Sequence, residues 1–118
     1  MTENDADEAL FECADGRRFF PIVMLKRIWY DHILDEHFDL AGREAQVELA
    51  ITQPDEIRRD RNHQNRACYY KIGDLPPPLH DRFVKVVVEV EDTENGRRGF
   101  VITAFVVPGI DHRERKIW

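Results

Sequence analysis

The chain has 118 residues, which is enough for one hydrophobic core but too few for two domains. Hydrophobic residues make up 42% and charged residues 34%, the balance of a globular protein with a heavily charged surface. No apolar run approaches the roughly 18 residues of a membrane span, and the acidic start differs from a secretory signal. We therefore expect a cytoplasmic protein whose two cysteines, Cys13 and Cys68, are reduced and buried.

The formal net charge of −6 is unevenly distributed along the chain. Residues 1–56 carry 14 acidic and 5 basic side chains (−9), whereas residues 57–118 carry 9 acidic and 12 basic ones (+3). Because salt screens charges beyond about 8 Å, a local anion-binding surface is compatible with an acidic protein. An ordinary solvated surface fits the same pattern equally well.

Residues 1–9 are acidic and are expected to form a flexible terminus, followed by a single domain over residues 10–118. Apolar residues over 10–13 and 18–24 predict the two strands of a hairpin. Asp15-Gly16 lies between them and is expected to supply the positive φ angles that a tight turn requires.

Two helices are predicted after this hairpin. The first spans about residues 25–38, where apolar side chains recur at helical spacing, and Gly42 lies just past its end. The second spans about residues 43–52 and ends at Pro54, because proline disfavours helical backbone in the residue before it.

The second half of the chain is predicted to be mainly strands. Segment 55–66 is rich in arginine and is expected to hold one helical turn around Ile57, and a strand follows over residues 67–72. Residues 83–90 and 99–107 are β-branched runs joined through an Asn95-Gly96 turn. The first of these runs has so few polar residues that we expect it to be a central strand.

This order of elements predicts an α+β fold: an N-terminal β-hairpin, two helices, then an antiparallel sheet with the helices packed on one face. Because strand side chains alternate, one of Tyr69 and Tyr70 should lie in the core and the other should be exposed. The charged tail over residues 111–118 is compatible with a further strand and with an RNA contact.

Several classes of site are excluded by what the sequence lacks. His32 and His37 are five residues apart, about 140° around an α-helix, so they are not expected to share a face or to bind one metal ion. The two cysteines lack a Cys-x-x-Cys spacing, the chain contains no serine, and it has no phosphate-cradling glycine loop. We therefore expect neither a metal nor a cofactor.

Chemistry that needs only side chains remains, and RNA cleavage is the main example. The substrate's own 2′-hydroxyl can attack the phosphorus if the protein supplies a base, an acid and a cation. Histidine suits the proton transfers because its ordinary pKa is about 6.5. Arginine suits the phosphate because its planar fork donates two hydrogen bonds, and a threonine or tyrosine hydroxyl can orient an oxygen.

Each candidate residue also has a structural interpretation. His32 is flanked by apolar helix residues, so a place in the core fits it as well as catalysis does. His37 lies in the last helical turn, where a partly charged imidazole favours the helix dipole. Thr103 is also a good strand former, and Arg66 ends a segment whose composition is typical of a solvated loop.

Five runs in this order resemble phage-associated domains of the barnase, EndoU, colicin and RelE-like nuclease group, the BECR fold. The resemblance covers about residues 11–105. The runs are Trp29-x-x-His32-Ile33-x-x-x-His37, Ala50-Ile51-x-x-Pro54-Asp55-x-Ile57, Tyr69-Tyr70, Val86-Val87-Val88 and Val101-Ile102-Thr103-Ala104-Phe105.

The resemblance implies a barnase/RelE-like ribonuclease fold and a metal-independent ribonuclease or toxin. It implies RNA as the substrate and an antitoxin or immunity protein as a partner, with no membrane attachment. The site residues it implies are His32, His37, Arg66, Tyr70 and Thr103.

Two features depart from the family pattern. Phe38-Asp39 follows the second histidine where many relatives have Pro-Glu, and the chain is acidic overall. Our leading hypothesis is an endoribonuclease-like domain of toxin type, in which a helix histidine and Thr103 act on an RNA phosphodiester lying across the sheet. The rival is a non-catalytic module with the same fold, whose acidic first half binds a protein partner.

Overall fold

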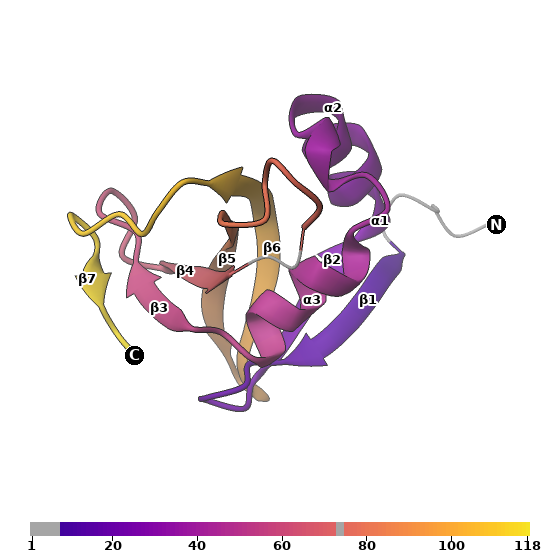
Figure 1. The fold of residues 1–118 in the computed structure, drawn as a ribbon. Helices are drawn as coiled ribbons and strands as arrows, with labels where there is room; N and C mark the ends of the chain where they lie inside the picture. The colour runs from indigo at the N-terminus through magenta and orange to yellow at the C-terminus, as the bar shows by residue number, and fades with distance from the viewer. Residues whose placement is uncertain (1–7, 73–74) are drawn as a thin grey trace, which may run out of the picture.

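A computed structural model of the protein describes residues 8–72 and 75–118. Its strands form one sheet with the order β1-β2-β6-β5-β4-β3-β7, as Figure 1 shows. The sheet and the helices together make an α+β fold, as the sequence predicts. The strands are β1 (Ala9–Ala14), β2 (Pro21–Leu25), β3 (Glu56–Arg59), β4 (Arg66–Ile72), β5 (Phe83–Thr93), β6 (Gly96–Val107) and β7 (Arg115–Lys116).

The sheet is mixed rather than antiparallel, which corrects the sequence prediction. The β2 strand lies parallel to β6, through the pairs Ile22↔Gly99 and Val23↔Phe100, while the other neighbouring strands are antiparallel. Hairpin signals fix the direction only of strands that follow each other closely in the chain. The helices and three strands separate β2 from β6, so local signals leave the direction of that pair open.

The predicted N-terminal hairpin is confirmed, but its glycine has a different role. Positive φ in this turn belongs to Phe19, at 61°, and not to Gly16. Gly16 instead lies against the end of the second helix, where its N–H donates to the Ile51 carbonyl at 3.1 Å. A Cβ at this position would lie 1.8 Å from the carbonyl oxygen of Thr52, so only glycine fits the approach.

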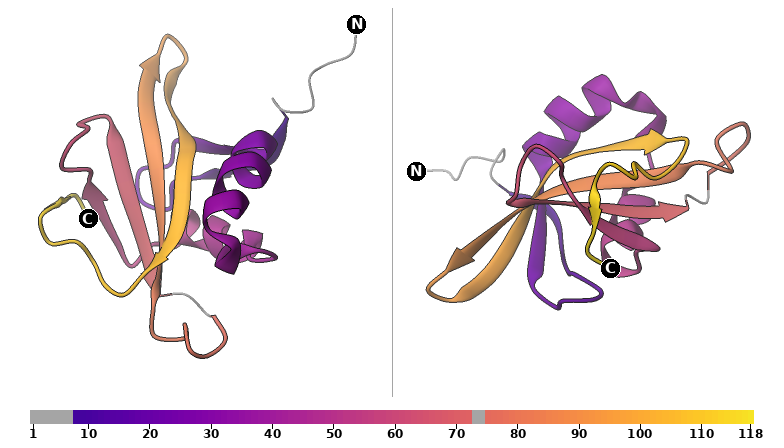
Figure 2. Two further views of the ribbon diagram at one scale, coloured as in Figure 1. Left: turned by 90° about the horizontal axis from the view of Figure 1, so that it is seen from above. Right: turned by 90° about the vertical axis from the view of Figure 1, so that its left-hand side faces the viewer.

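Both predicted helical regions are confirmed. The first is continuous over α1 (Lys26–Ile28), the π-helical η2 (Trp29–Ile33) and α2 (Leu34–Glu36). A 3-10 turn, η3 (Phe38–Leu40), follows, and Gly42 adopts a φ of 73° before α3 (Glu44–Thr52). Figure 2 shows this first helical segment running beside β6.

The two faces of the sheet are covered by different segments of the chain. The first face, here called the helix face, carries Ile57, Tyr69, Val86 and Ala104 in the main core. The helices pack on it through fully buried side chains that follow the 3.6-residue period of an amphipathic helix. These side chains are Trp29, Ile33, Val47, Ala50 and Ile51.

The second face, here called the tail face, carries a smaller cluster around Cys68, Tyr70 and Val87. It is covered by residues 108–114, which leave β6 and cross to β7 at the far edge of the sheet (Figure 1). This cover corrects the prediction for the tyrosine pair: Tyr69 and Tyr70 do alternate between faces, but both are 0% exposed. Sequence alternation cannot reveal that a distant tail seals the outer face.

The arginine-rich segment contains a strand, β3, and not a helical turn around Ile57. Ile57 pairs with Tyr69 of β4, and its side chain is fully buried. The tail adds β7 outside β3, so at least part of the tail is a strand. The long hairpin is confirmed: β5 is central in the sheet, Glu94 and Asn95 form the turn, and Gly96 begins β6 with a φ of 111°. Of the flexible terminus expected over residues 1–9, residues 1–7 lie outside the described part of the chain, and Ala9 begins β1.

Candidate functional site

The first helical segment presents its two histidines through an unusual backbone. The N–H of Leu34 donates to the carbonyl of Trp29, the five-residue spacing of a π-helix. This π-helical stretch ends at Ile33, Leu34–Glu36 is α-helical, and His37 follows the helix in non-helical backbone, with φ −134° and ψ 64°. Trp29 and Ile33 are fully buried by this arrangement, which anchors the segment in the core.

His32 and His37 converge on one carboxylate. Nε2 of His32 lies 3.8 Å and Nε2 of His37 3.9 Å from the same oxygen, Oε2 of Glu36. The two rings therefore meet at Glu36, which lies four residues after His32 and directly before His37, although their five-residue spacing was not expected to bring them together. Their side chains are 41% and 31% exposed, so both ring systems reach solvent.

His37 connects the helix to the tail face of the sheet. Its ring stacks on Phe105 of β6, with 5.2 Å between centroids and 30° between planes. Lys85 of β5 is the register partner of Phe105, and its Nζ lies 5.6 Å from the same ring. The imidazole and the ammonium group are therefore no more than about 11 Å apart, measured from ring centre to Nζ.

A buried carboxylate, Glu114, organises the polar groups of the tail face. It is 4% exposed and accepts hydrogen bonds from Nζ of Lys85 at 2.9 Å, from Sγ of Cys68 at 3.5 Å and from the Tyr70 hydroxyl. Nη1 of Arg58 donates to the backbone carbonyl of Glu114 at 2.7 Å. The tail is thus attached to three strands by hydrogen bonds.

This network sets the protonation states of its members. Burial, then the hydrogen bond to Glu114, raises the pKa of Tyr70 to about 12. Burial alone would lower the pKa of Lys85, but its interactions with Tyr70 and Glu114 outweigh burial and raise that pKa above its usual range. At neutral pH Lys85 is a cation and Tyr70 a neutral phenol, so both are hydrogen-bond donors and not bases.

Thr103 lies on the same face, opposite Val87 of β5. Its Oγ1 is buried and makes no hydrogen bond with any described residue. A buried hydroxyl without a partner is costly, and such groups are uncommon in native proteins. Thr103 is therefore a free donor and acceptor two residues along β6 from the ring on which His37 stacks.

Arg66 lies apart from the other predicted residues. It begins β4, where its Nε is 3.5 Å from Oε2 of Glu89. It lines a cavity of about 220 Å³ at the end of the sheet, together with Arg18, Arg59 and Arg97. The structure therefore groups His32 with His37, and His37 with the surface that carries Tyr70 and Thr103, but it places Arg66 at a second polar region.

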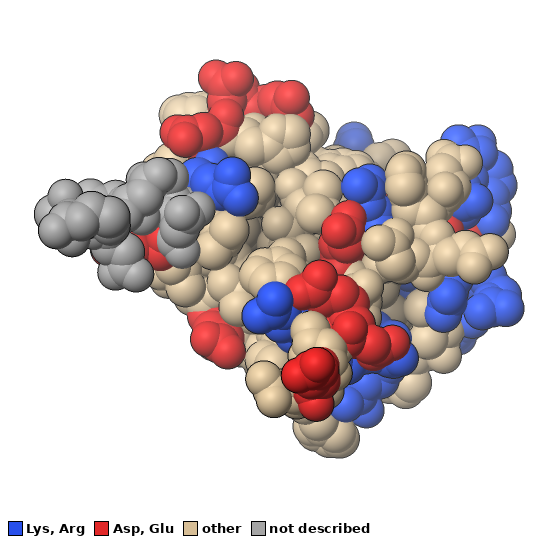
Figure 3. Space-filling model, turned by 180° about the vertical axis from the view of Figure 1, so that it is seen from behind, with Lys and Arg blue, Asp and Glu red and all other residues tan. Residues whose placement is uncertain are grey.

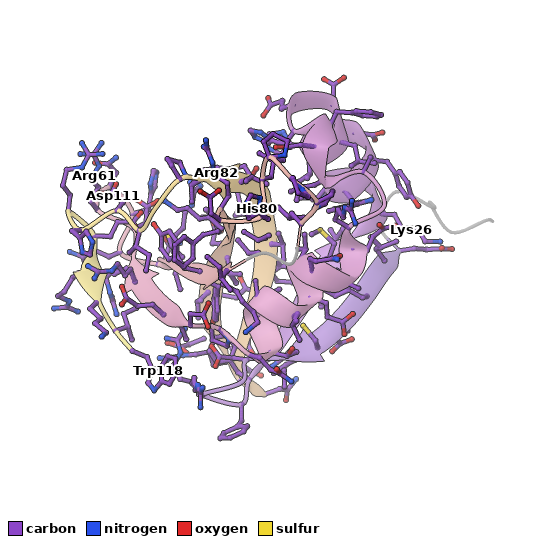
Figure 4. All side chains as sticks on the ribbon, viewed as in Figure 1. Lys26, Arg61, His80, Arg82, Asp111 and Trp118 are labelled. Carbon is purple, nitrogen blue, oxygen red and sulfur yellow. The ribbon has the colours of Figure 1, made fainter. Side chains whose placement is uncertain are left out.

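Charge follows the same division. Figure 3 shows acidic side chains gathered at the end of the molecule with the first helical segment, and basic ones at the opposite end over β7. Figure 4 places Arg61 and Asp111 together at this second end, and His80 and Arg82 on the loop before β5. Basic side chains thus gather at one end of the molecule.

Sequence reasoning missed two members of the tail-face network. Lys85 had a signal, because it is the first polar residue in the otherwise apolar run that starts β5. Glu114 had none, because it is one acid in a charged tail. Its burial follows only from the path that takes the tail across the sheet to β7.

No group of three or more histidine, cysteine, aspartate or glutamate side chains suited to a metal ion occurs among the described residues. Within the same residues, no helix has the length and apolar character needed to cross a membrane. No family model, characterised protein or solved structure matches the chain.

Proposed function

We propose that the protein is a metal-independent endoribonuclease-like domain of toxin type, with its site where the first helical segment meets β6. The observation that supports this is the pairing of two solvent-accessible imidazoles on Glu36, one of them stacked on the ring that Lys85 also approaches. An acid, a base and a cation are the groups that RNA cleavage without a metal requires. The family resemblance supports the same chemistry.

In the proposed reaction, one imidazole accepts the proton of the 2′-hydroxyl while that oxygen attacks the phosphorus. The bond from O2′ to phosphorus forms and the bond from phosphorus to O5′ breaks. The second imidazole, as imidazolium, donates its proton to the leaving O5′, so the products are a 2′,3′-cyclic phosphate and a 5′-hydroxyl. Lys85 offsets charge on the non-bridging oxygens, and the Thr103 hydroxyl donates to one of them.

Cleavage of RNA in EDTA by the purified protein tests this proposal. His32→Ala and His37→Ala should each lower the rate by about 10²–10⁴-fold, the usual contribution of an acid or a base. His63→Ala is the matched control, because the His63 ring is half-exposed in the β3–β4 turn and pairs with Asp60, away from the two candidate histidines. Cleavage that survives the His32/His37 double substitution, or that falls equally with His63→Ala, would contradict the assignment.

Growth of a bacterial host provides a second test, since a toxin-type enzyme should need a neutralising partner. Expression of the unmodified chain should slow growth, and His37→Ala should restore it. Equal growth with both chains, together with absence of RNA cleavage by the purified protein, would favour the alternative function.

That alternative is a non-catalytic protein-interaction module with a ribonuclease-like fold. It is favoured by the tail, which leaves Tyr70 0% and Glu114 4% exposed and so removes two polar groups from contact with a substrate. The acidic end of the molecule would then bind a basic partner protein. This function requires Glu36 and its acidic neighbours but neither imidazole, so the histidine variants distinguish the two.

A further inference from the structure

A second polar region lies on the helix face, at the end of the sheet that carries the β1–β2 turn. The β1–β2 turn, the β3–β4 hairpin and the β5–β6 hairpin surround a cavity of about 220 Å³ there. The β1–β2 and β5–β6 turns project on the same side of the molecule in Figures 1 and 2. The polar side chains used below come from one or other of these hairpins: Arg18, Arg59, Arg97 and Asp92.

The arginines of this cavity differ in how their charges are compensated. Nε of Arg18 is 3.2 Å from Oδ2 of the buried Asp15, and Nε of Arg97 is 2.9 Å from Oδ1 of Asp92. Arg59 has no ion-pair partner among the described residues. Arg59 therefore leaves a positive charge in the cavity that no acidic side chain of the described chain neutralises.

Arg59 is also incompletely hydrogen-bonded. Its Nη1 donates to the backbone carbonyl of Gln64 at 3.0 Å, which fixes the guanidinium at the mouth of the β3–β4 turn. Its Nε is buried and has no hydrogen-bond partner within residues 8–72 and 75–118. A buried donor left unpaired costs about 1–3 kcal/mol, so an incoming oxygen acceptor would be favoured at this position.

From these observations we infer that the cavity is a binding site for a phosphate group, with Arg59 as its central donor. Phosphate matches the arginine fork, which donates two parallel hydrogen bonds, and it carries the charge that Arg59 lacks. The volume is several times the roughly 30 Å³ that one water occupies, which leaves room for a phosphate and part of the attached sugar. That the phosphate belongs to RNA rests on the proposed function, whereas the phosphate chemistry does not.

The cavity is separate from the histidine site. Arg66 at its edge precedes Tyr70 by four residues, which is about 13 Å along a strand. The helix face also lies on the other side of the sheet from the ring that His37 contacts. The bound phosphate is therefore not the one that is cleaved, and the cavity holds another part of the strand and fixes its position.

Adjacent residues of one hairpin provide a matched pair for the test. Arg97 and Arg98 each form an exposed ion pair, with Asp92 at 2.9 Å and Glu91 at 2.7 Å. Their side chains are 48% and 52% exposed, but only Arg97 lines the cavity. Substitution of either residue by glutamine removes one positive charge. A difference in phosphate affinity between the two variants therefore reflects the place of Arg97 in the cavity and not the change in net charge.

The first experiment titrates the full chain with inorganic phosphate against sodium chloride at equal ionic strength, and follows the arginine Nε–H NMR signals. Phosphate should shift the Arg59 signal in the unmodified chain. Arg59→Gln should abolish saturable binding, Arg97→Gln should weaken it about tenfold, and Arg98→Gln should leave it within twofold. Equal weakening by Arg97→Gln and Arg98→Gln, or no phosphate-specific shift, would overturn the inference.

The second experiment identifies the source of the phosphate with a 2′-O-methyl RNA oligonucleotide, which cannot be cleaved. It is compared with and without a 5′-phosphate, and binding is measured by fluorescence anisotropy. If Arg59→Gln weakens the binding of both oligonucleotides, the phosphate in the cavity is an internal phosphodiester. If it weakens only the binding of the phosphorylated oligonucleotide, that phosphate is the terminal one. Affinity that is unchanged by Arg59→Gln for both oligonucleotides would overturn the RNA assignment.

These results separate the two proposals. Binding that depends on Arg59 in a chain that does not cleave RNA leaves the phosphate site in place and removes the enzyme. Cleavage that depends on the histidines, with phosphate binding that is unchanged by Arg59→Gln, supports the enzyme and removes the phosphate site. Arg59→Lys controls for folding, because it keeps the charge but loses the fork, and it should retain weak binding.

Discussion

Arg58 and Arg59 are neighbours in the sequence, but the alternation of β3 sends them to opposite faces of the sheet. Arg58 is 8% exposed and fully engaged, through the Glu56 carboxylate, the Glu114 carbonyl and Nδ1 of His112 at 3.3 Å. Arg59 has one backbone partner and an unpaired buried Nε. The comparison teaches that the partners of a guanidinium, rather than its burial, separate a structural arginine from a candidate ligand-binding one.

The same contrast holds for the regions around them. On the tail face, the Glu114 carboxylate accepts three hydrogen bonds and leaves little capacity for a ligand. On the helix face, the cavity holds more positive than negative side chains and an unused donor. We therefore expect substitutions within the Glu114 network to act on stability and substitutions in the cavity to act on binding.

The largest expected effect follows from removing Glu114. Glu114→Ala leaves the ammonium of Lys85 and the Tyr70 hydroxyl without their partner in a nearly dry site, so the free energy of unfolding should fall by about 3–5 kcal/mol. Urea denaturation measures this loss. Arg113→Ala, at the preceding residue of the tail, removes an exposed pair with Asp111 and should leave the free energy of unfolding almost unchanged. Similar losses in both variants would mean that the tail is not attached as described.

The second prediction compares the two arginines directly. Arg58→Ala should lower the free energy of unfolding by about 2–3 kcal/mol, because it removes charged hydrogen bonds to the buried Glu114 and the part-buried Glu56. Arg59→Ala should change it by about 0.5 kcal/mol or less in either direction, because it also removes an unpaired donor. Thermal denaturation of both variants in phosphate-free buffer measures this difference. A loss of stability in Arg59→Ala as large as that in Arg58→Ala would mean that Arg59 is structural.

Alkaline pH should lower the free energy of unfolding through two buried groups of the tail face, the Cys68 thiol and the Tyr70 phenol. Burial is the main reason that the pKa of Cys68 rises from 9.0, and that of Tyr70 from 10.0, each to about 12. In the unfolded chain these groups lose protons first, so stability is intact below about pH 9 and falls as the pH rises toward 12. Urea midpoints measured from pH 7 to 11 should decline only in the upper range.

Tyr70→Phe and Cys68→Ala provide the controls for this pH dependence. Each variant removes one titrating group, so each should flatten the decline above pH 9 even if it is less stable at pH 7. A decline of the same steepness in both variants would assign the alkaline loss to other groups, such as Tyr69, whose pKa burial also raises.

Much of the fold could be predicted because it depends on local signals. The β-branched runs and the Asn95-Gly96 turn predict β5 and β6, and apolar spacing predicts both helices. The strand β3 was missed because Ile57 is its only apolar residue, and the strand exists through pairing with β4. Pairing between distant segments also produces the parallel contact of β2 with β6.

The candidate site was predicted less well, for a related reason. His32 and His37 were found from residue type, but their approach to one carboxylate involves a helix end that places His37 in non-helical backbone, which residue type does not reveal. Glu114 and Arg59 were not distinguished from other charged residues, because only the folded partners separate them. The sequence thus identified the two histidines as candidates but not the geometry of either region.

The smallest expected effect on stability concerns Thr103, and it tests whether a group without a partner on the tail face is kept for function. Thr103→Val preserves shape and removes the buried hydroxyl that bonds to no described residue, so stability should stay equal or rise by up to about 1 kcal/mol. If the hydroxyl contacts RNA as proposed, cleavage should fall more than tenfold in the same variant. Thr103→Ser should keep the cleavage. A stable Thr103→Val variant with full activity would remove Thr103 from the site. Thr103 and Arg59 would then both have a buried polar atom without a partner, but only Arg59 would bind a ligand.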